Sequence, residues 1–122
     1  MSSTSLLLKD CVYRLTPPRG WKMALASSFL PYNEDDERDG FFHLSSAEQV
    51  LNTAQKYYSP YDELLALEFD EKSLGEELKW EASLGGNIYP HYYGFLPTDK
   101  VRRTLSVVKN DKGVFEIRGE AP

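Results

Sequence analysis

Cysteine is nearly absent from this sequence, which contains Cys11 alone. A single cysteine excludes an internal disulfide and the cysteine clusters that hold structural zinc. Cys11 lies in an apolar stretch, so we expect a packed thiol rather than a nucleophile, which needs a basic neighbourhood. So little cysteine is typical of a reducing compartment, and we expect a cytoplasmic protein.

Long apolar segments at the N-terminus and an excess of positive charge are also missing. Leu6-Leu7-Leu8 is too short for a signal peptide or a membrane span. The chain has 14 Lys and Arg against 19 Asp and Glu, a net charge of −5. An acidic surface repels phosphate backbones, so no nucleic acid is expected as a partner. The short apolar run likewise gives no reason to expect a membrane. The one tight basic cluster, Lys100, Arg102 and Arg103, is interpreted as a solvated strand end.

The motifs of several common enzyme classes do not occur. The phosphate-binding patterns G-x-x-x-x-G-K-[ST] and G-x-G-x-x-G are missing, as are H-E-x-x-H and the G-x-S-x-G elbow. We therefore expect no metal and no required cofactor. His43 and His91 with a carboxylate such as Asp39 or Glu81 have the right chemistry for a metal, but nothing in their spacing requires one.

The patterns that are present predict one α+β domain over residues 1–122, with its core at about 11–118. Thr16 is expected to cap a helix that ends near Ser28, and residues 29–40 are expected to form a loop. Ser45-Ser46-Ala47-Glu48 matches a capping box, which predicts a second helix from about Ser46 to Tyr58. The remaining segments read as strands: 11–15, 41–45, 64–69 (central), 78–82, 87–93, and a closing hairpin of 101–108 and 114–118.

Only two histidines are available for chemistry, and the first is His43. Strand alternation places Phe42 and Leu44 toward the core and His43 on the opposite face with Ser45. A position just before a helix N-terminus favours an anion such as a phosphate. A structural histidine held by the cap or by Asp39 is the alternative.

His91 and Glu81 are the other candidates. Alternation puts Tyr89, His91 and Tyr93 on one side of their strand, where they form either a surface for a ring-shaped ligand or an ordinary aromatic ladder. Glu81 shares a face with its strand neighbours Lys79 and Ser83, and Trp80 takes the other. Such a carboxylate acts as a base, stabilises positive charge on a sugar, or is simply exposed.

Three motifs in order resemble the proteins known as the domain of unknown function 952 family, whose signature reads roughly D-G-F-I-H-L-S, then W-E, then F-P-H-L-Y-G. The match covers about residues 11–108, and its departures, such as Phe42 for Ile, preserve bulk. The corresponding segments here are Asp39-Gly40-Phe41-Phe42-His43-Leu44-Ser45, Trp80-Glu81 and Pro90-His91-Tyr92-Tyr93-Gly94.

The resemblance implies a fold similar to that of ADP-ribosyltransferases and RNA 2′-phosphotransferases. That fold has a split, curved, mostly antiparallel sheet with two main helices and a cleft for NAD or a related nucleotide. Carried over onto the motifs, it marks Asp39, Ser45, Trp80, Tyr93 and Gly94 as ligand-binding. His43, Glu81 and His91 become the catalytic candidates.

The resulting hypothesis is a cleft protein for a small nucleotide-like ligand, with NAD as a substrate of glycosyl-type transfer. His43 would hold the ribose, Tyr93 would stack, and Glu81 would stabilise the oxocarbenium-like transition state. The alternative is a non-catalytic ligand-binding or protein-interaction domain. An RNA 2′-phosphotransferase ranks lower, because the acidic charge offers no basic groove. The sequence leaves the oligomeric state open.

Overall fold

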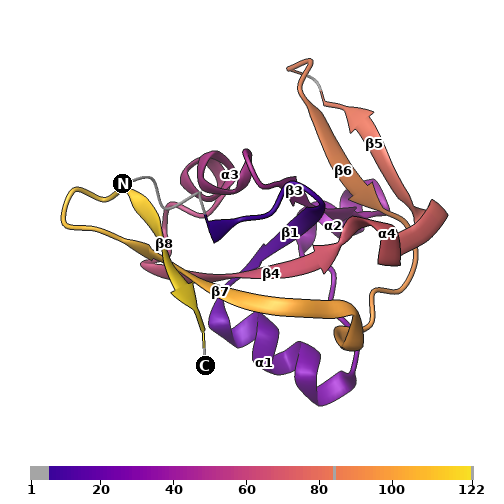
Figure 1. Ribbon diagram of the computed structural model, residues 1–122, viewed down its shortest axis with the longest axis horizontal. Helices are drawn as coiled ribbons and strands as arrows, with labels where there is room; N and C mark the ends of the chain where they lie inside the picture. The colour runs from indigo at the N-terminus through magenta and orange to yellow at the C-terminus, as the bar shows by residue number, and fades with distance from the viewer. Residues whose placement is uncertain (1–5, 84, 122) are drawn as a thin grey trace.

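The computed structural model describes residues 6–83 and 85–121, and its centre is a five-stranded antiparallel sheet (Figure 1). The strand order is β3-β1-β4-β7-β8, with β4 in the middle. Both faces of β4 are covered, which explains why its sequence is almost continuously apolar. The strands are β1 (Cys11–Thr16), β3 (Ser45–Ser46), β4 (Glu63–Asp70), β7 (Val101–Lys109) and β8 (Phe115–Glu120).

A second, three-stranded sheet has the order β2-β6-β5. It consists of β2 (Phe42–His43), β5 (Leu78–Ala82) and β6 (Ile88–Tyr92). All its pairs are antiparallel, and the β5–β6 hairpin projects from the body of the molecule (Figure 1). The α+β class and the split into antiparallel sheets are therefore confirmed.

Two longer helices cover opposite faces of the five-stranded sheet, as Figure 1 shows. Helix α3 (Val50–Tyr57) supplies Val50 and Ala54 to one core, together with Tyr13 and Leu64. Helix α1 (Pro18–Ser27) supplies Ala24 to the other. That second core also contains Phe42, Leu44, Leu67, Phe69, Tyr92 and Leu96, so it joins the two sheets.

The predicted loop over residues 29–40 was wrong, because it contains helix α2 (Glu34–Asp39). The Asn33 side chain accepts a hydrogen bond from the Asp36 amide, and the Asp36 carboxylate accepts one from the Asn33 amide. This reciprocal cap satisfies two N–H groups that would otherwise be unpaired. Four acidic residues in the first turn suit the positive end of the helix dipole, so the charge run favours helix here.

Both predicted helix starts were also wrong. Thr16 is the last residue of β1, and Pro17 caps α1 without a side-chain bond. Ser45 and Ser46 belong to β3, and α3 begins only at Val50. The carboxamide of Gln49 accepts from the Ser46 amide and also donates to the Ile88 carbonyl. Ser45 and Ser46 therefore pair with β1 in the sheet instead of capping the helix as the sequence pattern predicted.

The remaining short helices are α4 (Glu71–Leu74) and two 3₁₀ turns, Gly75–Glu77 and Thr98–Lys100. The hairpin of β7 and β8 is confirmed, and Cys11 is buried as expected. The basic cluster is more than a solvated strand end. Arg103 donates to both oxygens of Glu68, whose carboxylate is fully buried and also accepts from the Tyr13 hydroxyl.

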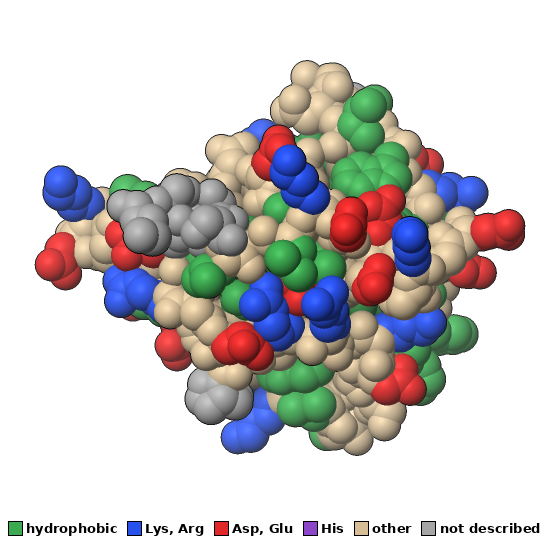
Figure 2. Space-filling model, in the orientation of Figure 1, with side chains coloured by type: hydrophobic (Ala, Val, Ile, Leu, Met, Phe, Trp, Pro, Cys, Tyr) green, Lys and Arg blue, Asp and Glu red, His purple; other side chains and the backbone are tan. Residues whose placement is uncertain are grey.

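No helix among the residues described is long and apolar enough to cross a membrane. On the face shown in Figure 2, acidic and basic side chains are interspersed and no histidine is visible.

Candidate functional site

His43 and His91 lie side by side, although 47 residues separate them in the chain. They form a directly opposed pair between β2 and β6, so their side chains leave the small sheet on the same face. Their ring centroids are 5.6 Å apart with the planes nearly perpendicular. The sheet register thus brings together the two residues that the sequence singled out.

Glu81 connects His91 to Tyr93. Its Oε1 atom lies 2.7 Å from His91 Nδ1 and accepts a 2.7 Å hydrogen bond from the Tyr93 hydroxyl. Both hydrogen bonds lower the pKa of Glu81, and the bond from Tyr93 has the larger effect. The carboxylate in turn raises the pKa of Tyr93. Glu81 is therefore ionised at neutral pH and orients the imidazole through Nδ1–H. Among the described residues no group hydrogen-bonds His91 Nε2.

His43 is held at both ring nitrogens. Nδ1 lies 2.8 Å from Asp36 and Nε2 lies 2.9 Å from Asp39. Carboxylates only accept, so both nitrogens carry hydrogen and the ring is an imidazolium. Burial opposes this charge, but the hydrogen bonds and charges of Asp36 and Asp39 outweigh it and raise the pKa of His43 above 6.5. In this arrangement His43 has no lone pair with which to act as a base.

Asp36 is the residue that the sequence interpretation missed. Its carboxylate is fully buried and accepts from Arg14, from the Asn33 amide, and from both the amide and ring of His43. Burial tends to raise the pKa of Asp36, but the His43 and Arg14 bonds outweigh it and lower the pKa. The available signal was the spacing of Asn33 and Asp36, which is that of an N-cap residue and the third residue of its helix.

Phe41 was also missed as a site residue. Its ring stacks on His91 at 4.0 Å between centroids, and lies 4.6 Å from His43 and 5.2 Å from Tyr93. The histidines, Phe41, Tyr93 and Glu81 form one contiguous group, which we call the histidine cluster. Within it, Phe41 stacks on the His91 ring and Glu81 binds the Nδ1 atom of that ring.

Three predicted ligand-binding residues are not members of the histidine cluster. Ser45 is buried, and its hydroxyl donates to Thr53. The chain passes from the small sheet to the large one between His43 and Ser45, which ends the alternation that grouped them. Trp80 is on the other face of β5, where its indole donates to Glu71. Gly94 follows Tyr93 with φ of +115°, a conformation that favours glycine.

The predicted anion site at a helix N-terminus is not formed at His43. The His43 ring contacts Asp39 at the C-terminal end of α2. Helix α3 begins at Val50, seven residues after His43. Among the residues described, no group of three or more His, Cys, Asp or Glu side chains is arranged to hold a metal ion.

Residues 15–104 match the family described as "Protein of unknown function (DUF952)". The chain belongs to this family. The match contains all three motifs from which the membership was predicted, including the segments that supply His43, Glu81 and His91.

Two solved structures of another protein share the fold. The crystal structure of protein CC0527 from Caulobacter crescentus is 35% identical and superposes with a TM-score of 0.80, covering 87% of this chain and 93% of that one. The solution NMR structure of CC0527 gives 35% identity and a TM-score of 0.77, covering 86% and 90%. A search of curated proteins found no match to this chain.

Proposed function

We propose that this DUF952 protein binds a ribose-containing nucleotide such as NAD or ADP-ribose at the histidine cluster and, with NAD as the donor, transfers the ADP-ribosyl group to an acceptor. The observation that carries the proposal is the shared carboxylate of Glu81, which bonds both His91 and Tyr93. The fold similarity to ADP-ribosyltransferases that the family resemblance implies is the reason for choosing this class of nucleotide.

His91 is suited to the role of general base. With Nδ1–H directed at an ionised carboxylate, the neutral tautomer places its lone pair on Nε2. This is the arrangement in which a carboxylate orients a histidine for proton abstraction. The ribose-binding role first assigned to His43 is not kept, because Asp36 and Asp39 occupy both nitrogens of His43.

Glu81 is suited to stabilising positive charge on a sugar. Both of its hydrogen bonds go to Oε1, and its side chain is 39% exposed, so Oε2 is accessible. A fixed carboxylate beside the ribose C1′ atom stabilises the oxocarbenium-like transition state. The Phe41 and Tyr93 rings offer surfaces for stacking a nicotinamide or adenine ring.

The proposed reaction needs two reactants, NAD and an acceptor with a hydroxyl group. The bond between C1′ and the nicotinamide nitrogen breaks, and its electron pair stays on the nitrogen, which neutralises the pyridinium ring. The acceptor oxygen forms the new bond to C1′, and its proton passes to His91 Nε2.

Calorimetric titration with NAD and ADP-ribose, together with an assay of nicotinamide release, tests this function. Removing a general base costs about 10²- to 10⁴-fold in rate, so His91→Gln and Glu81→Gln are expected to lose turnover. Glu63→Gln, at an exposed position on β4, is the matched control. Failure of the wild-type protein to bind either nucleotide would reject the proposal.

The second candidate is a non-catalytic ligand-binding or protein-interaction domain. It is favoured by the stacking of Phe41 over His91 and by the saturation of His43, both of which suit a scaffold. Melting temperatures separate the two candidates. Replacing His91 with Ala should lower the melting temperature if the residue is structural, whereas site residues often cost little or even stabilise.

A further inference from the structure

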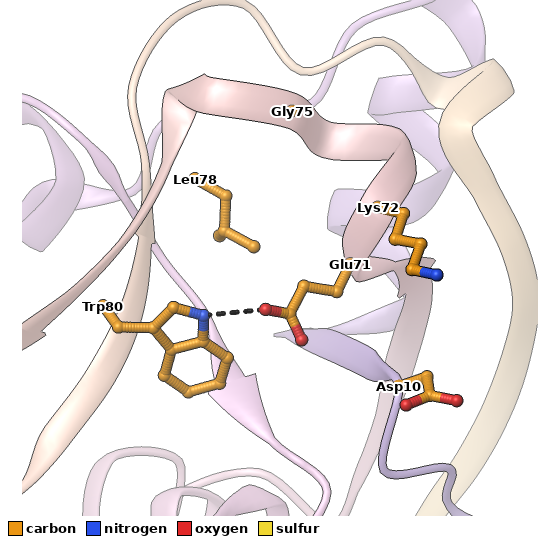
Figure 3. Close-up of a pocket in the computed structure, with 6 residues that line it drawn as sticks. All are labelled: Asp10, Glu71, Lys72, Gly75, Leu78 and Trp80. Carbon is orange, nitrogen blue, oxygen red and sulfur yellow. Dashed lines mark hydrogen bonds between the residues drawn. The ribbon is translucent and has the colours of Figure 1, made fainter.

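The face of the β5–β6 hairpin opposite the histidine cluster borders a hollow of about 320 Å³ (Figure 3). Trp80 and Glu81 are adjacent in β5, so alternation directs their side chains to opposite faces. Helix α4 forms the other wall. The lining residues are Asp10, Glu71, Lys72, Gly75, Leu78 and Trp80.

The Trp80 ring is fixed in orientation. Its Nε1 donates a 3.0 Å hydrogen bond to Glu71 Oε2, drawn in Figure 3. The ring remains accessible to a ligand from the hollow, since Trp80 is 42% exposed. A large exposed aromatic ring that is held in one position offers a preorganised binding surface, because little side-chain entropy is lost when a ligand binds.

The hollow also has an excess of negative charge. Asp10 and Glu71 contribute two carboxylates, and Lys72 is the one basic residue in the lining. Among the described residues, no Lys or Arg forms an ion pair with either carboxylate within 4 Å. Figure 3 shows the Lys72 side chain directed away from the indole.

Other aromatic rings of this chain already have a cation over them. Arg14 lies over Phe42, Lys56 over Tyr57 and Lys109 over Phe115, each within 6 Å of the ring centroid. No described cation takes that position at Trp80, although indole attracts cations more strongly than the other aromatic side chains do. The exposed indole, the nearby carboxylates and the space between them are therefore all complementary to a cation.

We propose that the Trp80 hollow binds an organic ammonium ion, presented either by a small free molecule or by a lysine side chain. The cation lies against the indole with its charge toward Glu71 and Asp10. The net charge of −5 attracts cations to the molecule from a distance. The site is separate from the histidine cluster, so its test is independent of the proposed nucleotide chemistry.

Fluorescence provides the test. The chain has two tryptophans, and Trp21→Phe leaves Trp80 as the sole indole reporter. This variant is titrated with choline, with its uncharged isostere 3,3-dimethylbutan-1-ol, and with N-acetyl-lysine methylamide. We expect saturable quenching by choline that weakens with added salt and is not reproduced by the neutral isostere. Saturation by the lysine derivative at lower concentration would identify a side chain as the source, and the reverse order would identify a free cation.

Substitutions assign the contacts. Glu71→Gln keeps an acceptor for the indole N–H but removes the charge, and should weaken choline binding roughly two- to fivefold, the effect of one exposed ion pair. Lys72→Gln should tighten it by a similar factor, because a repelling charge is lost. Glu48→Gln, on an exposed turn away from the hollow, should change nothing. Equal binding of choline and its neutral isostere, or no saturation by any ammonium compound, would overturn the proposal.

Discussion

Asp36 joins three parts of the molecule through a single carboxylate. It caps α2, it binds the guanidinium of Arg14 on β1, and it fixes both the backbone and the ring of His43 on β2. A buried carboxylate with this many donors stays ionised, because every lost solvent contact is replaced. Asp36 therefore determines where His43, and with it one side of the histidine cluster, is held.

Asp36→Asn should lower the free energy of unfolding by about 3–5 kcal/mol, since it leaves the Arg14 charge buried without a counterion. Arg14 is 5% exposed, so water cannot compensate. Urea denaturation measures the difference. The neighbouring Asp35 pairs with Arg38 at the surface, so Asp35→Asn should cost less than about 1 kcal/mol. Equal effects of the two substitutions would contradict the central role given to Asp36.

His43 should make stability fall as pH rises above 6.5. Its pKa in the folded protein is raised above the 6.5 of the unfolded chain. Protonation therefore favours the fold, and the contribution is complete below the unfolded pKa and is lost as pH rises through the folded value. Between about pH 6 and about pH 9, wild-type protein should lose more stability than His43→Gln, measured by urea denaturation at each pH. Parallel profiles would show that the ring is not an imidazolium.

At the scale of elements, the starts of the helices are decided by competition for hydrogen-bonding groups. Asn33 caps α2 with its side chain. Ser45, which has the sequence signature of a cap, is instead in β3 with Ser46, and the Gln49 side chain binds the Ser46 amide. Strand pairing between β1 and β3 displaces the start of α3 to Val50.

Two alanine substitutions test these helix starts. Asn33→Ala should cost about 1 kcal/mol, the usual effect of removing a side-chain cap. Glu48→Ala should stay within about 0.5 kcal/mol, because Glu48 is exposed in the turn before α3 and its side chain caps nothing. Thermal denaturation followed by circular dichroism gives both values. A large effect at Glu48 would restore the capping box predicted from the sequence.

On the scale of the whole molecule, β4 supports two hydrophobic cores. Leu64 faces the core beneath α3, and Leu67 faces the core that contains α1 and the small sheet. Because β4 contributes side chains to both cores, loss of packing in one core also weakens the other. The histidine cluster is positioned by the second core through Phe42, Leu44 and Tyr92.

Leu64→Ala and Leu67→Ala should therefore each destabilise the entire domain, by about 2–5 kcal/mol. Both variants should unfold in one transition, with the far-ultraviolet circular dichroism and tryptophan fluorescence curves coinciding. A variant in which the two probes separate would show that the cores unfold independently.

The fold class, most strands and the family could be predicted from the sequence alone. Local patterns were enough for these, because alternation and apolar runs report burial directly, as in β4 and in the opposite faces of Trp80 and Glu81. Proximity of His43 and His91 remained a hypothesis, since strand order and register depend on contacts between distant segments.

The three-dimensional structure was needed to establish the pairing of β2 with β6, the helical form of residues 34–39 and the burial of Ser45. It also decided that Asp36 and Asp39 saturate His43 while Glu81 leaves Nε2 of His91 without a described partner. The physical reason is that hydrogen-bonding groups choose among all partners that folding brings near. A local pattern records which groups are available, but not which of them a distant strand or carboxylate will occupy.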